Sequence, residues 1–155
     1  MAVQNDYALH LDPIWRDRAN YILNAELVGD DLPKHFEQLW TRQVDDNEFE
    51  ICCIPFFLYD MALGDIVRSR SDGSGLVERV VQSSGRYVFR AILNDSGAPF
   101  VDVTAWIEQR GGLLEWSSRH MIAIDAVNEV EAQQIADYLA DLEAQGRLVY
   151  ETGRS

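Results

Sequence analysis

The alternation of apolar and polar residues predicts a β-rich first half. From Tyr21 to Val28, apolar side chains recur at every second position, the period of a strand with one buried face. Similar segments follow, separated by turn residues such as Gly, Pro, Asp and Asn. The expected strands include residues 21–28, 36–44, 49–54, 66–70 and 76–82. A succession of about six short strands is typical of a small barrel or a curled sheet.

The second half changes period. Apolar side chains recur at +3, +6 and +7 from Phe100, which places them on one face of a helix. A second helix is expected from Asn128, a good N-cap with Glu131 at the capping-box position, to Gly146. The expected strands here are residues 86–93, 113–116, 120–124 and 147–151. The order is β-α-β-β-α-β, the ferredoxin-like pattern, so the sequence predicts an α+β fold.

The chain divides into three expected parts. Residues 1–19 have no clean hydrophobic period and predict a loosely structured N-terminal arm. Residues 20–84 form the β-rich half and residues 85–155 the ferredoxin-like half. No Pro- or Gly-rich linker separates the halves, so we expect them to pack as one compact unit.

The charge of the chain excludes some classes of partner. The 155 residues include 13 Lys+Arg and 26 Asp+Glu, a formal net charge of −13. A phosphate backbone would be repelled by such a protein, so we expect no nucleic-acid binding. No apolar run approaches the roughly 20 residues of a membrane span. The N-terminal residues lack a basic segment followed by an apolar one, which predicts a cytoplasmic protein without membrane contact.

Residues that commonly carry chemistry do not form a recognisable motif. No phosphate-binding glycine loop, nucleophile elbow or zinc-protease motif occurs. The three histidines are scattered, and no Cys or His pair has ligand spacing, so we expect neither a metal nor another cofactor. The adjacent Cys52 and Cys53 are expected to be reduced thiols that pack as small apolar groups. The sequence therefore predicts no catalytic residue and no enzyme.

Two polar residues leave alternatives open. Asp65 is either a lone carboxylate in a cleft or a turn residue that accepts hydrogen bonds from nearby backbone N–H groups. His120 lies beside Arg119 and is either a general base or a lone histidine, because the sequence shows no nucleophile or orienting acid for it. The neighbouring apolar residues Phe56, Phe57 and Leu63 are expected in the core.

The acidic residues gather at three places. Predicted turns and the last helix carry clusters that could contact a cationic partner protein, and the default alternative is that they serve solubility. The candidate partner-binding residues are Asp30, Asp31, Asp45, Asp46, Glu48, Asp137 and Asp141.

A local motif resembles a known family. The segment Ile54–Tyr59, with its Pro-Phe-Phe-x-Tyr, is followed by Gly64-Asp65-x-Val. Together they resemble the core of the bacterial domain-of-unknown-function family 4265, and the resemblance extends over about residues 36–151. Ile54 stands where an asparagine is common in that family, so any role of this amide is absent here. The family brings no established activity, so the resemblance implies no site residues.

These observations favour a non-enzymatic protein-binding function. A small, strongly anionic protein without a catalytic motif suits an immunity protein that neutralises a bacterial toxin by occluding its cationic active site. A regulatory or small-molecule-sensing module is the alternative, because ferredoxin-like halves often bind ligands. An enzyme with an unrecognised site is a further class. The oligomeric state is open.

Overall fold

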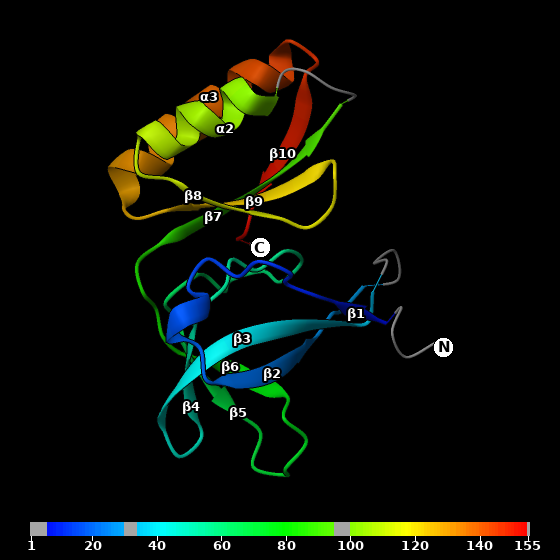
Figure 1. Ribbon diagram of the computed structural model, residues 1–155, viewed down its shortest axis with the longest axis vertical. Helices are drawn as coiled ribbons and strands as arrows, with labels where there is room; N and C mark the ends of the chain where they lie inside the picture. Colours follow the sequence, from blue (N-terminus) through cyan, green and yellow to red (C-terminus); the bar gives the residue numbers. More distant parts are fainter. Residues whose placement is uncertain (1–5, 30–33, 95–99, 155) are drawn as a thin grey trace.

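Two β-sheets and a helical layer succeed one another along the long axis of the molecule (Figure 1). The computed structural model describes residues 6–29, 34–94 and 100–154. The first sheet comes from the N-terminal half, and the second sheet and both α-helices come from the C-terminal half. The expectation of an α+β fold with a β-rich first half is confirmed.

The first sheet is built around one long strand. Its strands are β1 (Tyr7–Ala8), β2 (Tyr21–Glu26), β3 (Phe36–Asp45), β4 (Glu48–Ile51), β5 (Ile66–Ser69) and β6 (Val77–Gln82). β2 pairs antiparallel with one edge of β3, while β1, which is parallel, and β4, which is antiparallel, share the other edge. The predicted hairpin at Asp45–Asn47 is confirmed, because β3 turns directly into β4 there.

The first sheet curls but does not close. The order β3-β4-β5-β6 brings the last strand back toward β2, where the backbone N–H of Asn24 donates to the Gly75 carbonyl at 2.9 Å. Within the described residues, only an isolated bridge between Asn24 and Leu76 joins the two ends, rather than a ladder. Of the two expected forms, the curled sheet is therefore confirmed and the closed barrel is wrong.

The second sheet carries the helices on one face. Its elements are β7 (Tyr87–Leu93), α2 (Phe100–Gln109), β8 (Leu113–Trp116), β9 (Met121–Ala126), α3 (Glu129–Ala144) and β10 (Leu148–Thr152). The strands are antiparallel throughout, in the order β10-β7-β9-β8. The Asn128 side chain accepts a hydrogen bond from the Glu131 N–H at 2.9 Å, which confirms the predicted start of α3.

A small apolar cluster joins the halves. Separate cores lie inside the curl of the first sheet and between the second sheet and its helices. The joining cluster contains Ile54, Phe56, Ala62, Leu63, Val88 and Ala123. The core positions predicted for Phe56 and Leu63 are confirmed, whereas Phe57 is only half-buried.

The N-terminal segment is packed rather than loose. From residue 6 to residue 19 it forms β1 and a short 3-10 helix, η1 (Arg16–Arg18), and it buries Ala8 and His10. The backbone N–H of Trp15 donates to the Cys52 carbonyl at 3.1 Å. The expectation of a loosely structured arm is therefore wrong for residues 6–19. Polar contacts keep this segment in place, and such contacts produce no hydrophobic period in the sequence.

Candidate functional site: a buried histidine between two glutamates

His10 binds a carboxylate through each of its ring nitrogens. Nε2 lies 2.7 Å from Oε2 of Glu37 on β3, and Nδ1 lies 2.7 Å from Oε1 of Glu115 on β8. The side chains of His10 and Glu37 have no exposed surface, and Glu115 exposes 2% of its own. The three residues thus connect the N-terminal segment to both sheets, which lie one above the other in Figure 1.

Backbone donors occupy the other lone pairs of the two carboxylates. Glu37 accepts hydrogen bonds from the N–H groups of Phe56 at 2.7 Å and Phe57 at 2.9 Å. Glu115 accepts from the N–H of Ile54 at 2.5 Å and from that of Ile14 at 3.3 Å. A carboxylate that only accepts is ionised, and an imidazole that donates from both nitrogens is an imidazolium. The cluster is therefore a fully hydrogen-bonded ion triad.

The environment of His10 favours its charged form. Burial by itself would lower its pKa, but the interactions with Cys53, Glu115 and Glu37 outweigh burial and hold the pKa well above the ordinary 6.5. The thiol of Cys53 is neutral at neutral pH because burial raises its own pKa. The two carboxylates therefore supply the charge that keeps the imidazolium protonated, while the ring of Phe56 stacks on it at 4.0 Å.

The stability of the protein should fall as the pH rises above neutral. Because the folded-state pKa of His10 is raised, its contribution is complete below about pH 6.5, the unfolded pKa, and is lost as the pH passes through the folded value. We expect a slope of up to about 1.4 kcal/mol per pH unit between these two values. Urea unfolding at a series of pH values measures it. The same series on His10→Gln should lack the pH-dependent contribution of His10. If the free energies of unfolding of the two proteins changed with pH in parallel, the prediction would be contradicted.

The triad is built to hold the structure together rather than to meet a substrate. Every polar atom of the three side chains has a partner inside the protein, and Phe56 of the apolar joining cluster stacks on His10. Cys53, the nearest nucleophile type, is fully buried and its pKa is raised by burial. A substrate could reach these groups only if the two halves separated.

The adjacent cysteines are free thiols, as predicted. Burial and the nearby Glu50 carboxylate raise the pKa of Cys52 to about 11. Because thiolates rather than thiols react, we expect native protein at pH 8 to react slowly with a thiol reagent such as Ellman's reagent. Unfolding in urea should release both thiols at once. A thiol that reacts rapidly in the native protein would contradict the burial of the two cysteines.

The loop between β4 and β5 is held by a buried arginine. Arg90 on β7 donates to the carbonyls of Leu58 and, at 3.4 Å, Pro55, and it pairs with Glu151 at 3.3 Å. Asp65, farther along the loop, accepts from the N–H of Ala62 at 2.9 Å and from that of Ser84 at 2.7 Å. The turn alternative for Asp65 is thereby confirmed.

The structure keeps the two described acidic clusters apart. Asp45 and Asp46 are exposed at the tip of the β3–β4 hairpin, at the opposite end of the molecule from α3, which carries the exposed Asp137 and Asp141 (Figure 1). Glu48 is half-buried and pairs with Arg68 at 2.8 Å. Asp30 and Asp31 lie outside the described residues. The two described clusters therefore do not combine into one surface.

Sequence reasoning missed the triad because its members are far apart in the chain. His10 is 27 positions from Glu37 and 105 from Glu115. One signal was available: Glu37 falls in the buried phase of its strand, two residues before Leu39. A charged residue in that phase requires a buried partner, although the alternation alone does not identify which one.

The described residues show no further candidate centre of this kind. Within residues 6–29, 34–94 and 100–154, no group of three or more His, Cys, Asp or Glu side chains is arranged to hold a metal ion. In the same part of the chain, no helix is both long and apolar enough to cross a membrane.

Comparisons with known proteins extend the resemblance found in the sequence. No curated protein matches the chain. A solved structure described as a hypothetical protein from Neisseria gonorrhoeae matches with a TM-score of 0.72 and 22% identity, over 87% of this chain and 96% of that chain. At this identity the likeness establishes a common fold. A family model described as a domain of unknown function, DUF4265, matches residues 37–150, a span that contains both glutamates of the triad but not His10. The chain belongs to the DUF4265 family.

Proposed function

We propose that this protein is a non-enzymatic protein-binding protein that uses an anionic surface to bind a cationic partner. More narrowly, we propose a cytoplasmic immunity protein of a bacterium, which inhibits a cognate toxin by occluding its active site. The observation that carries the proposal is the outer face of α3. Its buried stripe consists of Ala132, Ile135, Leu139 and Leu142, and every charged residue on its other positions is a carboxylate.

The charge on α3 has a single sign. No lysine, arginine or histidine occurs within Glu129–Ala144, and the helix carries the acidic residues Glu129, Glu131, Asp137, Asp141 and Glu143. Asp137 and Asp141 are one helical turn apart and exposed. Their mutual repulsion costs the free protein a small amount of stability, which a cationic partner would relieve.

Of the described clusters, the α3 cluster suits a partner better than the hairpin tip. Glu48 already has a cation in Arg68, and the Asp45 carboxylate accepts from the backbone N–H of Asp46 at 2.8 Å. Among the described residues, no basic side chain pairs with Asp137 or Asp141. These two carboxylates can therefore meet an arginine or lysine of a partner without first breaking an ion pair.

Charge reversal on α3 should slow association with the cationic partner. For Asp137→Arg with Asp141→Arg we expect the association rate at low salt to fall about tenfold or more, because electrostatic steering is removed. The matched pair Asp45→Arg with Asp46→Arg should change it little. The test uses the product of the toxin gene that an immunity gene is expected to adjoin. It measures association rates from about 0.1 M to 1 M salt, where the screening length falls from about 10 Å to about 3 Å.

The outcomes separate the function classes. Deletion of this gene alone should harm the cell, and deletion together with the toxin gene should not. If the association rate did not depend on salt and neither charge-reversed pair changed it, the net charge of the protein would serve solubility instead. Stabilisation by a metabolite instead of a protein would favour the sensing alternative.

We also propose that the C-terminal half is ferredoxin-like. The order β-α-β-β-α-β and the antiparallel strand order β10-β7-β9-β8, with both helices on one face, support this class. In such a sheet β8 and β10 are the edge strands.

A further inference from the structure

Three side chains form a continuous stack between α2 and α3. The rings of Trp106 on α2 and Tyr138 on α3 are stacked, with their centroids 3.8 Å apart and an angle of 10° between their planes. The guanidinium of Arg110 lies over the ring of Trp106, 3.7 Å from its centroid. Two groups that are both in van der Waals contact with the centre of one ring cannot share a face of it. Arg110 and Tyr138 therefore lie on opposite faces of Trp106, and Tyr138 ends the stack.

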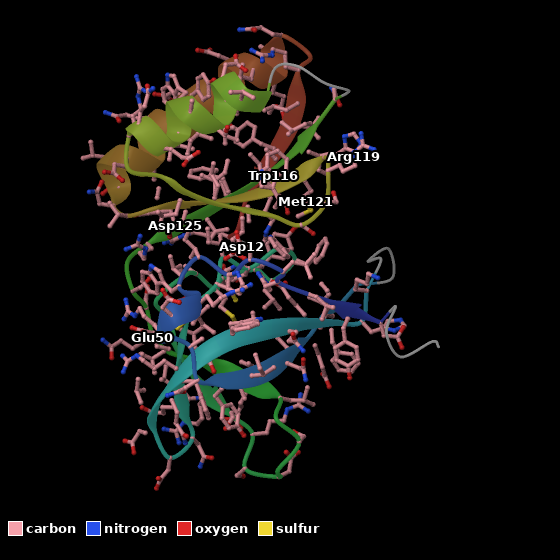
Figure 2. All side chains as sticks on the ribbon, viewed as in Figure 1. Asp12, Glu50, Trp116, Arg119, Met121 and Asp125 are labelled. Atoms are coloured by element: carbon pink, nitrogen blue, oxygen red, sulfur yellow. The ribbon has the colours of Figure 1, made fainter. Side chains whose placement is uncertain are left out.

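The second face of the Tyr138 ring is not covered by another ring or cation. Within the described residues, Trp106 is its one ring contact, and no guanidinium lies over it. The side chain is half-buried, so part of the ring meets solvent. Figure 2 shows both helices at one end of the molecule, beyond the strands that carry the labelled Trp116, Met121 and Asp125. A planar group of a partner can therefore approach Tyr138 from outside.

A carboxylate lies next to this ring on the same helix. With 3.6 residues per turn, Asp141 is about 60° around α3 from Tyr138 and one turn toward the C-terminal end. Residues at this spacing are neighbours on a helix surface. Asp141 is exposed, and among the described residues no basic side chain pairs with it. The nearby cation Arg147 is already paired with Asp102 at 3.2 Å, so it leaves Asp141 available to a cation from outside.

An aromatic face beside a carboxylate suits a guanidinium better than an ammonium. A guanidinium is planar and stacks on a ring, while its N–H groups point outward in its own plane and can bond to a carboxylate at the edge of that ring. An ammonium is a compact point charge and gains less from a flat surface. The contact of Arg110 with Trp106 is the same pairing within the protein. The net charge of −13 adds a long-range attraction for any cation.

We propose that Tyr138 is the binding site for an arginine side chain of the cationic partner, which stacks on the outer face of the ring and pairs with Asp141. Tyrosine and arginine are among the residues that most often dominate the energy of protein interfaces. This inference rests on the proposed function, because it names the partner residue that the α3 surface binds. It depends on an aromatic ring rather than on charge alone, so the two can fail separately.

The test compares a tetra-arginine and a tetra-lysine peptide, both with blocked ends and the same charge. We expect tetra-arginine to shift the NMR signals of the Tyr138 ring and the Asp141 amide. Its own side-chain CH2 protons next to the guanidinium should move upfield, which is the ring-current effect of stacking on an aromatic face. Tetra-lysine should bind about two- to fivefold more weakly by the same signals, the usual effect of a cation–π contact at an exposed site.

Four variants separate the ring from the charge. Tyr138→Leu should lower the affinity for tetra-arginine to that for tetra-lysine, whereas Tyr138→Phe keeps the ring and should bind like the wild type. The matched control is Tyr150→Leu, which should change neither affinity, because Tyr150 is half-buried against the same core but lies on β10. Asp141→Asn should weaken the binding of both peptides, because both use its charge. If Tyr138→Leu does not fold, the upfield shift and the preference for arginine in the wild type and in Tyr138→Phe decide the question.

Several results would overturn the inference. No upfield shift of the arginine signals at millimolar peptide would exclude stacking on Tyr138. If both peptides bound equally and Asp141→Asn weakened both, the anionic surface of α3 would stand and the arginine site would fall. Upfield-shifted arginine signals in the protein without peptide, lost on dilution, would identify a second copy as the occupant instead. If tetra-arginine stacked on Tyr138 but neither Tyr138→Leu nor the reversal of Asp137 and Asp141 changed association with the toxin, the arginine site would stand and the proposed function would fall.

Discussion

Replacing His10 with alanine is expected to lower the free energy of unfolding by about 3–5 kcal/mol at pH 7. The substitution leaves Glu37 and Glu115 buried without their cation, and removing one partner of a buried ion pair typically costs that much. Urea unfolding at equilibrium measures the loss. His35→Ala is the matched control, because His35 pairs with Asp6 but exposes 74% of its side chain, so we expect a change within about 0.5 kcal/mol.

A second measurement keeps the prediction testable if His10→Ala does not fold. Glu115→Gln retains the side-chain volume and removes one charge, so it should destabilise the protein at pH 7 and flatten its pH dependence. Added imidazole should partly restore His10→Ala, because it can occupy the vacated space and donate to both carboxylates. A loss below about 1 kcal/mol for His10→Ala would show that the triad does not hold the halves together.

Replacing Phe56 with alanine is expected to cost about 3–5 kcal/mol, the usual effect of truncating a buried phenylalanine. Phe56 exposes 1% of its surface, packs in the joining cluster and stacks on the ring of His10. The neighbouring Phe57 is half-buried and lies at a surface groove, so Phe57→Ala should cost about 1–2 kcal/mol. Thermal or urea unfolding of both variants compares them directly.

The two substitutions at the seam should not be additive. Because the rings of Phe56 and His10 are in contact, the double variant should differ from the sum of the single ones by about 0.5–3 kcal/mol. Equal losses for Phe56→Ala and Phe57→Ala would contradict the different burial of the two rings. Additivity with His10→Ala would show that the stack adds no stability of its own.

Local signals in the sequence predicted the secondary structure. The strand expected at residues 36–44 occurs as β3, Phe36–Asp45, and the helix expected from Asn128 begins at Glu129 with Asn128 as its N-cap. These features depend on residues a few positions apart, through period, capping and turn preference. The Pro-Phe-Phe and Gly-Asp motif likewise sufficed to identify the family.

The mistaken expectations all concern contacts between distant residues. The N-terminal segment looked loose because His10 and Trp15 belong to no hydrophobic period. Whether the first sheet closes into a barrel depends on how far it curls, which the alternation within each strand does not specify. Phe56 and Phe57 are chemically identical neighbours, and only packing distinguishes the buried ring from the half-buried one.

By itself, the sequence determined the α+β class, most element boundaries, the family and the anionic surface, because each follows from local pattern or from composition. Only the tertiary structure decided that His10 lies between Glu37 and Glu115 and that β8 lies at the edge of its sheet. The physical reason is that an ion triad and a sheet edge are defined by partners from separate elements. Which partners meet depends on the path of the whole chain, and no spacing along the sequence records it.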